Sequence, residues 1–357
     1  MDPGFTAAFA NDARFQAGVS LSASTENNKS PIDLAREQAR GLVDASKVYH
    51  AAKLPPGDVH MPSGVSLLTD IASLLASAYQ VQEKTIAVEG GTLRLRCLTP
   101  TDIEEDASLP VLVWFHSGGW IVGDLEQDDN HLRSICVELQ LCVVNVDYRL
   151  APEHPFPTSV NDAYNAMKWV TENAQSLRIS LSKGFIVGGD SAGANMATVC
   201  AHLARDDPLF EGRQPTGQLL REPSVVQEEV YPAEYKAELL SMEEFKDGPL
   251  LTRETLKQCR ALLQAAPADP RISPLLFPSH AGVPRAFITY NGADPLRDDG
   301  RLFARVLREA GVPTLEIMYP GVPHGFYYSF PDIALGRKAD QDIRDGLRWL
   351  LADGMSE

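Results

Sequence analysis

The amino-acid sequence predicts an α/β fold, with a mostly parallel β-sheet that is flanked by helices on both faces. Short apolar segments of the kind that form buried strands recur along the chain, and amphipathic segments with helical spacing lie between them. This alternation favours parallel pairing, because the chain crosses back over the sheet through each helix. Glycine-containing loops follow several of the apolar segments, at the sheet edge where α/β proteins carry their working residues.

The composition is that of an ordinary globular chain of 357 residues, with 44% hydrophobic and 22% charged residues. A net charge of −16 argues against nucleic acid or an anionic membrane as a partner, because both repel an acidic surface. No segment approaches the ~18 consecutive apolar residues of a membrane span, and the N-terminus lacks the features of a signal peptide. The five cysteines are scattered without metal-ligand spacing. We therefore expect a cytoplasmic protein with free, buried thiols.

The N-terminal region, residues 1–83, is expected to hold two helices that pack against the rest of the chain. Apolar residues repeat at helical spacing in residues 31–51 and again over Val65–Tyr79. A Leu-Pro-Pro-Gly sequence at residues 54–57 ends the first of these helices. Neither segment contains residues that suggest chemistry.

The predicted sheet is built from two stretches of chain, residues 84–204 and 266–357. The first stretch opens with a hairpin, in which Thr85–Val88 and Leu93–Cys97 are joined by a turn at Gly90 and Gly91. The remaining expected strands are apolar runs at Pro110–Phe115, Leu141–Val146, Gly184–Val187, Arg285–Tyr290 and Thr314–Tyr319. Helices are expected at Asp162–Val170, Ala194–Ala204, Arg301–Glu309 and in the C-terminal segment that contains Ile343, Leu347, Leu350 and Leu351.

Residues 205–265 interrupt this alternation of strands and helices. The segment is polar, acidic and broken by prolines, with helical spacing only near Glu254–Leu263. Long segments of this kind inside a compact domain are often functional lids. We therefore expect an insertion that contributes to a cap over the sheet.

The strongest local motif is Gly189-Asp190-Ser191-Ala192-Gly193, which fits the pattern G-x-S-x-G between a strand-type and a helix-type segment. A sharp strand-to-helix turn of this sequence exposes a serine at the top of a sheet, and glycines leave room for the tight backbone. The helix that follows presents N–H groups and a positive dipole end to developing negative charge. The pattern alone is a weak signal, since a glycine-rich turn with an idle serine would look the same. The strand–turn–helix context favours a nucleophile at Ser191.

Loops at the carboxyl ends of later strands supply an acid and a base. Asp294 directly follows an expected strand, whereas Asp298 and Asp299 have a simpler explanation as N-caps of the next helix. Hydrolases with the G-x-S-x-G turn order their catalytic residues as Ser, then Asp or Glu, then His. Of the eight histidines, only His324 follows both Ser191 and Asp294. The sequence therefore predicts these three residues as nucleophile, acid and base.

A second glycine-containing loop follows the expected strand that ends at Phe115, with the sequence His116-Ser117-Gly118-Gly119-Trp120. A glycine pair there exposes backbone N–H groups, which are the donors that stabilise an oxyanion during acyl transfer. The alternative reading is an ordinary turn between a strand and a helix.

From about residue 84 to 352 the chain resembles the hormone-sensitive-lipase-like esterases. The resemblance depends on five motifs: His116-Ser117-Gly118-Gly119, Asp147-Tyr148-Arg149-Leu150-Ala151-Pro152-Glu153, Gly189-Asp190-Ser191-Ala192-Gly193, Asp294-Pro295-Leu296-Arg297-Asp298 and His324-Gly325-Phe326. It implies an α/β-hydrolase core (84–204 and 266–357) with a helical cap from residues 1–83 and 205–265. It also implies a carboxylesterase without cofactor or metal.

By position in these motifs, Ser191 is the nucleophile, His324 the base and Asp294 the acid that orients it. The resemblance further implies an oxyanion hole built from the N–H groups of Gly118, Gly119 and Ala192. The chain departs from the family at Ser117, where the His-Gly-Gly-Gly motif has its first glycine. The chain also resembles fungal members that act on esters of secondary metabolism.

The expected function is therefore that of a serine carboxylesterase, which hydrolyses small-molecule esters of small acyl groups through an acyl-enzyme intermediate. Two alternatives stay open. One is a non-hydrolytic biosynthetic enzyme, a lyase or cyclase, that uses the same pocket. The other is a small-molecule receptor like the gibberellin receptors, which share the motifs but lack the triad histidine; His324 argues against it. The oligomeric state is left open, with a homodimer as one expectation.

Overall fold

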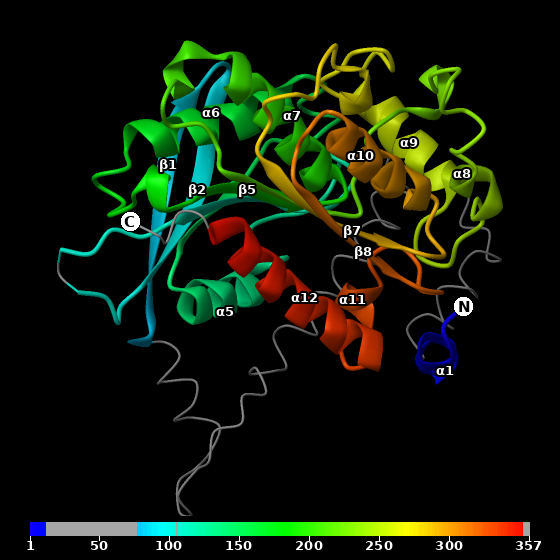
Figure 1. Ribbon diagram of the computed structural model, residues 1–357, viewed down its shortest axis with the longest axis horizontal. Coiled ribbons are helices and arrows are strands. Elements are labelled where there is room, and N and C mark those ends of the chain that lie inside the picture. The colour runs from blue at the N-terminus through cyan, green and yellow to red at the C-terminus, as the bar shows by residue number, and fades with distance from the viewer. Residues whose placement is uncertain (12–76, 105, 353–357) are drawn as a thin grey trace, which may run out of the picture.

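The computed structural model describes residues 1–11, 77–104 and 106–352, and its centre is a mixed β-sheet (Figure 1). The strand order among these residues is β1-β2-β4-β3-β5-β6-β7-β8. An antiparallel hairpin, β1 (Tyr79–Val88) and β2 (Gly91–Pro100), pairs through β2 with β4 (Cys142–Asp147), also antiparallel. From β4 to β8, each strand in this order pairs in parallel with the next. The strands not yet named are β3 (Val111–Phe115), β5 (Phe185–Asp190), β6 (Gly217–Arg221), β7 (Arg285–Asn291) and β8 (Thr314–Tyr319). The predicted fold class is confirmed.

Helices cover both faces of this sheet, as Figure 1 shows. On one face lie α6 (Thr158–Glu172), α7 (Ala192–Asp206) and α10 (Arg297–Glu309), and on the other lie α5 (Asp129–Leu139) and α12 (Ala334–Leu351). The remaining described helices are α1 (Pro3–Asn11), α8 (Ser241–Glu244), α9 (Arg253–Leu263) and α11 (Phe326–Ser329). None of the described helices is both long and apolar enough to cross a membrane.

The two faces of the sheet have separate hydrophobic cores, and β3 contributes to both. Val113 and Phe115 pack in the core under α6, α7 and α10, whereas Leu112 and Trp114 pack in the core under α5 and α12. Because every residue of β3 is buried on one face or the other, the strand reads as a continuous apolar run. All five cysteines are free and buried, as expected from the sequence.

Strand β6 was not expected, and it lies inside the segment 205–265 that the sequence analysis treats as an insertion. It pairs in parallel with β5 and β7, and all five of its residues are buried. Its sequence includes Gln218 and Arg221, so no apolar run marks it. The Gln218 amide donates to Pro284 O at 2.8 Å, and Arg221 is 3.8 Å from the Asp190 carboxylate. The excursion above the sheet therefore begins only after Arg221.

Helix α1 was not expected either, and it packs beside the loop that follows β8. Phe5 is 1% exposed and shares a hydrophobic cluster with Val322, Phe326 and Phe330. The backbone N–H of Asp2 donates to Gly321 O at 2.6 Å. The two helices expected at residues 31–51 and Val65–Tyr79 lie outside the described residues, apart from the last three positions of the second, where Tyr79 begins β1.

Asp298 and Asp299 are not the N-caps that the sequence suggests, since α10 begins at Arg297. Both carboxylates are buried in the first helical turn and bind the backbone of the segment that follows β6. Asp298 accepts from the N–H groups of Leu240 and Ser241, at 2.9 and 2.8 Å. Asp299 accepts from the two successive backbone N–H groups directly after Ser224, at 2.9 and 3.3 Å. They fix the excursion after β6 to the core, and the dipole of α10 favours negative charge there.

This arrangement predicts that Asp299→Ala destabilises the fold by about 1–3 kcal/mol, because two buried N–H groups lose their acceptor. Asp299→Asn, which keeps an amide oxygen as an acceptor, should lose less. Urea unfolding measures the difference. The control is Asp345→Ala, since Asp345 makes an ion pair with Arg348 and its side chain is 58% exposed. Equal stability of the Asp299→Ala and Asp345→Ala variants would contradict the role assigned to Asp299.

Candidate active site

Ser191 occupies the sharp turn between β5 and α7 that the motif predicts. Its φ of 54° and ψ of −110° are unusual for a residue other than glycine. Ser191 is buried, with 8% of its surface exposed. The two flanking positions must be glycine, because a Cβ would clash there with neighbouring backbone atoms. A Cβ on Gly189 would lie 2.4 Å from the carbonyl carbon of Gly193, and a Cβ on Gly193 would lie 1.9 Å from Phe115 O. The turn is therefore pressed against the end of β3, from which the second glycine loop starts.

The structure brings Ser191, His324 and Asp294 together although they come from three different loops. The distance from Ser191 Oγ to His324 Nε2 is 2.9 Å, and the distance from His324 Nδ1 to Asp294 Oδ2 is 2.7 Å. Asp294 is fully buried, and its Oδ1 accepts the N–H of Leu296 at 2.8 Å. A hydrogen-bonded chain of hydroxyl, imidazole and carboxylate is an arrangement that can activate a serine hydroxyl as a nucleophile.

A second carboxylate, which the sequence analysis missed, lies beside the same imidazole. Glu222 follows β6 and is fully buried, and its Oε2 is 3.2 Å from His324 Nδ1. The sequence offered a signal only if Gly217–Arg221 was recognised as a strand. Glu222 would then have stood at the carboxyl end of a parallel strand, like Ser191 and Asp294.

The electrostatic setting of His324 is dominated by these two acids. Burial lowers the pKa of His324, but the negative charges of Asp294 and then Glu222 outweigh it and raise the pKa to about 10. Burial raises the pKa of Glu222, while the adjacent positive charge of His324 lowers it and favours the carboxylate. The two carboxylates therefore stabilise the imidazolium form of His324 relative to the neutral ring.

Beneath Ser191, charged and aromatic side chains form a second buried cluster. Arg221, at the end of β6, has its guanidinium 3.7 Å from the ring centroid of Tyr327, and Tyr327 donates its hydroxyl to Asp190 at 2.6 Å. Burial raises the pKa of Asp190, and the charge of Arg221 acts against the rise. The phenol of Tyr328 donates to Asp128, at 2.9 Å. The cluster links the end of β5 to α11, which directly follows His324.

Gly118 and Gly119 both have left-handed backbone conformations, with φ of 124° and 60°. A Cβ on Gly118 would lie 2.0 Å from Val122 O, and one on Gly119 would lie 2.8 Å from the Cys259 sulfur in α9. Within the part of the chain that the structure describes, no acceptor takes the N–H groups of Gly118, Gly119 or Ala192. Three free donors therefore lie in the loop and turn that meet next to Ser191.

His116 holds this loop in position and does not join the triad. Its ring stacks on Tyr148 with centroids 4.1 Å apart, and the Tyr148 hydroxyl donates to His116 O at 2.8 Å. A Cβ on Gly123 would lie 2.2 Å from the imidazole, so the chain after the loop needs glycine there. Both His116 and Tyr148 belong to motifs that the sequence analysis singled out.

The described residues contain one group that has the composition of a metal site, made of Glu222, Asp294 and His324, with the ligand atoms within 4.8 Å of one another. His324 Nδ1 is hydrogen-bonded to Asp294 Oδ2 at 2.7 Å and lies 3.2 Å from Glu222 Oε2. A cation in this group would have to replace the hydrogen bond between His324 and Asp294. The group therefore fits an acid–base site better than a metal centre.

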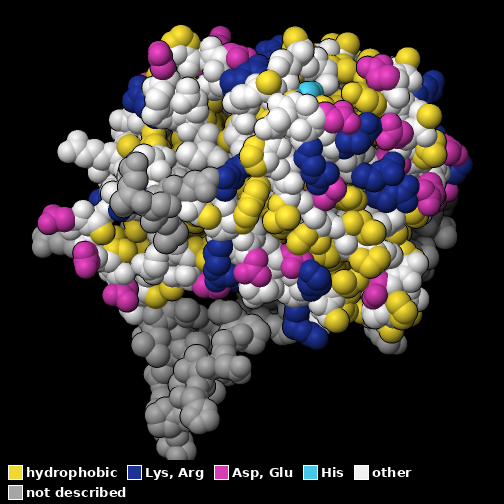
Figure 2. Space-filling view, viewed as in Figure 1, with side chains coloured by type: hydrophobic (Ala, Val, Ile, Leu, Met, Phe, Trp, Pro, Cys, Tyr) yellow, Lys and Arg dark blue, Asp and Glu magenta, His cyan; other side chains and the backbone are white. Residues whose placement is uncertain are grey.

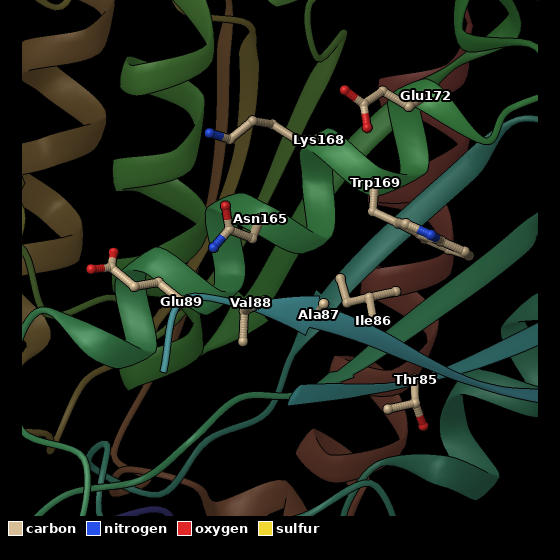
Figure 3. Close-up of a pocket in the computed structure, with 9 residues that line it drawn as sticks. All are labelled: Thr85, Ile86, Ala87, Val88, Glu89, Asn165, Lys168, Trp169 and Glu172. Atoms are coloured by element: carbon tan, nitrogen blue, oxygen red, sulfur yellow. The ribbon is translucent and has the colours of Figure 1, made fainter. Parts of the chain in front are cut away.

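A cavity of about 680 Å³ lies away from these residues, between β1 and α6 (Figure 3). Figure 3 shows Ile86 and Val88 of β1 on one side and Asn165, Lys168 and Trp169 of α6 on the other. Neither Ser191 nor His324 lines it. On the face of the molecule in Figure 2, acidic and basic side chains are interspersed, although the chain as a whole carries a net charge of −16.

Residues 112–328 match the family model described as alpha/beta hydrolase fold, Abhydrolase_3. The chain is 37% identical to the carboxylesterase NlhH of Mycobacterium tuberculosis over 254 residues, which cover 69% of this chain and 75% of that protein. It is 31% identical to the versiconal hemiacetal acetate esterase of Dothistroma septosporum over 250 residues, 70% of this chain and 75% of that one. Among solved structures it is similar to vibralactone cyclase, at 35% identity and a TM-score of 0.82, over 97% of this chain and 96% of that chain.

Proposed function

This chain belongs to the alpha/beta hydrolase fold family Abhydrolase_3, and on that premise we propose that it is a carboxylic ester hydrolase of the serine type. The observation that carries the proposal is the hydrogen-bonded chain from Ser191 through His324 to Asp294, at 2.9 and 2.7 Å. The names of the similar carboxylesterases support the same activity. The proposed substrate is a small-molecule ester.

In the proposed reaction, Ser191 Oγ attacks the ester carbonyl carbon while His324 Nε2 accepts the hydroxyl proton. The C–O bond to the alcohol then breaks, and the alcohol leaves with the proton from Nε2. Water attacks the acyl-enzyme, with Nε2 again taking a proton, and the carboxylic acid leaves as Ser191 regains its own. Asp294 keeps the Nδ1 proton of His324 in place and stabilises the imidazolium that forms twice.

The oxyanion of each tetrahedral intermediate would be held by the N–H groups of Gly118, Gly119 and Ala192. These donors have no other acceptor among the described residues, and the N-terminus of α7 adds its positive dipole end. Ser117 precedes the two glycines, so its replacement of the family's first glycine removes no donor.

The segment after β6 is proposed to act as a cap over the site. In this segment α8 and α9 lie beside α10 (Figure 1). Cys259 of α9 lies against Gly119 of the proposed oxyanion hole, and Met242 and Leu256 pack with Leu296, directly before α10. Any substrate that reaches Ser191 would therefore contact α9 or its neighbours. Residues 1–83 are expected from the sequence to belong to the same cap, but Tyr79 already begins β1, so only the chain before Tyr79 is proposed to contribute to it.

A second candidate is a cyclase, favoured by the similarity to vibralactone cyclase. The same acyl-enzyme would then be released by a hydroxyl group of the acyl chain itself, which attacks in place of water and forms a lactone. The two candidates share every step up to acylation of Ser191. They differ only in which oxygen His324 activates afterwards.

The activity is tested with p-nitrophenyl esters of increasing acyl length, by following release of p-nitrophenolate. We expect turnover of short acyl chains and a loss of several orders of magnitude in Ser191→Ala. Analysis of the acid product separates the two candidates when the acyl chain carries a terminal hydroxyl. Lactone as the main product would favour the cyclase, and activity that survives in Ser191→Ala would contradict both.

The proposed oxyanion hole predicts a contrast between two neighbouring positions. Gly119→Val should lower kcat by about 10²–10³, since the side chain meets Cys259 and moves an N–H donor. Ser117→Gly, the matched control, should change kcat/KM by much less, because no donor moves. Steady-state kinetics on one short ester measures both. A hundredfold loss in Ser117→Gly would mean that the serine hydroxyl contacts the reacting group and that the assignment of the donors is wrong.

A further inference from the structure

We propose that Glu222 is a positioning residue of the same site, a second carboxylate that fixes the His324 loop and shares the Nδ1 proton with Asp294. The inference rests on the proposed function and goes beyond the triad of Ser191, His324 and Asp294. It is carried by the position of Glu222 at the end of β6, by its contacts and by the kind of donors that face it.

Glu222 is held in a defined backbone position at the carboxyl end of the sheet. Its φ is 49°, in the left-handed region, and its N–H donates to Thr289 O on β7 at 2.7 Å. The residue is 0% exposed. A glutamate in a strained conformation and without contact with water is costly unless its carboxylate has specific partners.

Those partners are the backbone groups on either side of His324. Glu222 Oε2 accepts the N–H of Gly325 at 2.8 Å. Glu222 Oε1 accepts from the Asn291 amide, and the same amide nitrogen donates to Pro323 O at 2.7 Å. The residues immediately before and after His324 are thus both tied, directly or through Asn291, to one buried carboxylate.

The hydrogen-bond donors around position 222 favour a carboxylate side chain over a neutral amide. The N–H of Gly325, the amide of Asn291 and Nδ1 of His324 all approach its two oxygens. A carboxylate accepts at both oxygens, whereas a glutamine would turn one NH₂ group towards a donor. An ionised Glu222 also attracts the imidazolium of His324, which forms when Ser191 gives up its proton.

The other charged and titratable groups near this pair define the expected pH dependence. Asp294 from the loop after β7 and Asp190 at the end of β5 both favour the cationic form of His324, and Tyr319 and Tyr327 are the neutral phenols beside Glu222. Removing the charge of Glu222 leaves these groups unchanged. The imidazolium then loses one of its two nearest anions, so the pKa of His324 falls and its neutral, proton-accepting form persists to lower pH.

The test compares wild type, Glu222→Gln, Asp294→Ala and the double variant, with kcat/KM measured against pH on a short p-nitrophenyl ester. In Glu222→Gln we expect the acidic limb of the profile to move down by about one pH unit or more. We also expect kcat on the plateau to fall roughly tenfold, with a smaller change in KM. Glu138→Gln removes the same charge from a carboxylate of α5 that pairs with Arg344 at 2.6 Å and is the matched control; it should leave the profile where it is.

The double variant tests the sharing of the Nδ1 proton. If Glu222 partly replaces the missing acid, Glu222→Gln should cost clearly more in the Asp294→Ala background than in wild type. Equal costs in the two backgrounds, or an unmoved acidic limb in Glu222→Gln, would overturn the proposal. Glu222→Asp, which keeps the charge, should hold the acidic limb closer to that of wild type and serves if the glutamine variant fails to fold.

An NMR titration of His324 in protein with labelled histidine separates this inference from the proposed function. The pKa of His324 should be lower in Glu222→Gln than in wild type, whether or not any ester is turned over. If the wild type hydrolyses no ester and the pKa still shifts, the proposed function fails and the position assigned to Glu222 stands. An unchanged pKa of His324 in an active enzyme would reject the inference alone.

Discussion

The turn between β5 and α7 is the constraint on which the rest of the site depends. Ser191 stands there with a positive φ, and the turn closes only because Gly189 and Gly193 leave no side chain between it and the end of β3. That contact brings the loop of Gly118 and Gly119 next to the serine. The parallel order of β3, β5, β6, β7 and β8 then delivers every other functional side chain to the same edge of the sheet.

The same edge concentrates buried charge to an unusual degree. Asp190, Arg221, Glu222, Asp294 and Asp299 are all at most 5% exposed, and each is bound by other buried groups. Burying a charge is costly unless it is paired or hydrogen-bonded, so such a set is expected at a site and not in an ordinary core. Part of the set acts on His324, and Asp299 instead fixes the chain that covers the site.

The sequence predicted what depends on local pattern and missed what depends on distant partners. Thr314–Tyr319 is β8 to the residue, because this short segment contains Thr, Ile and Tyr, which favour strands. Ser191, Asp294 and His324 were found from motif and chain order, and the structure joins them by hydrogen bonds. Strand β6 was missed because Gln218 and Arg221 find buried partners that only the fold supplies, and Glu222 was missed with it.

The central claim is that Ser191 is the nucleophile activated by His324, and covalent labelling tests it most directly. The protein is treated with a fluorophosphonate, which phosphonylates an activated serine with loss of fluoride, and the adduct is located by peptide mass spectrometry. The account predicts one adduct per chain, on the peptide with Ser191, and labelling slowed by orders of magnitude in His324→Ala. Labelling at another residue, or an unchanged rate in His324→Ala, would contradict it.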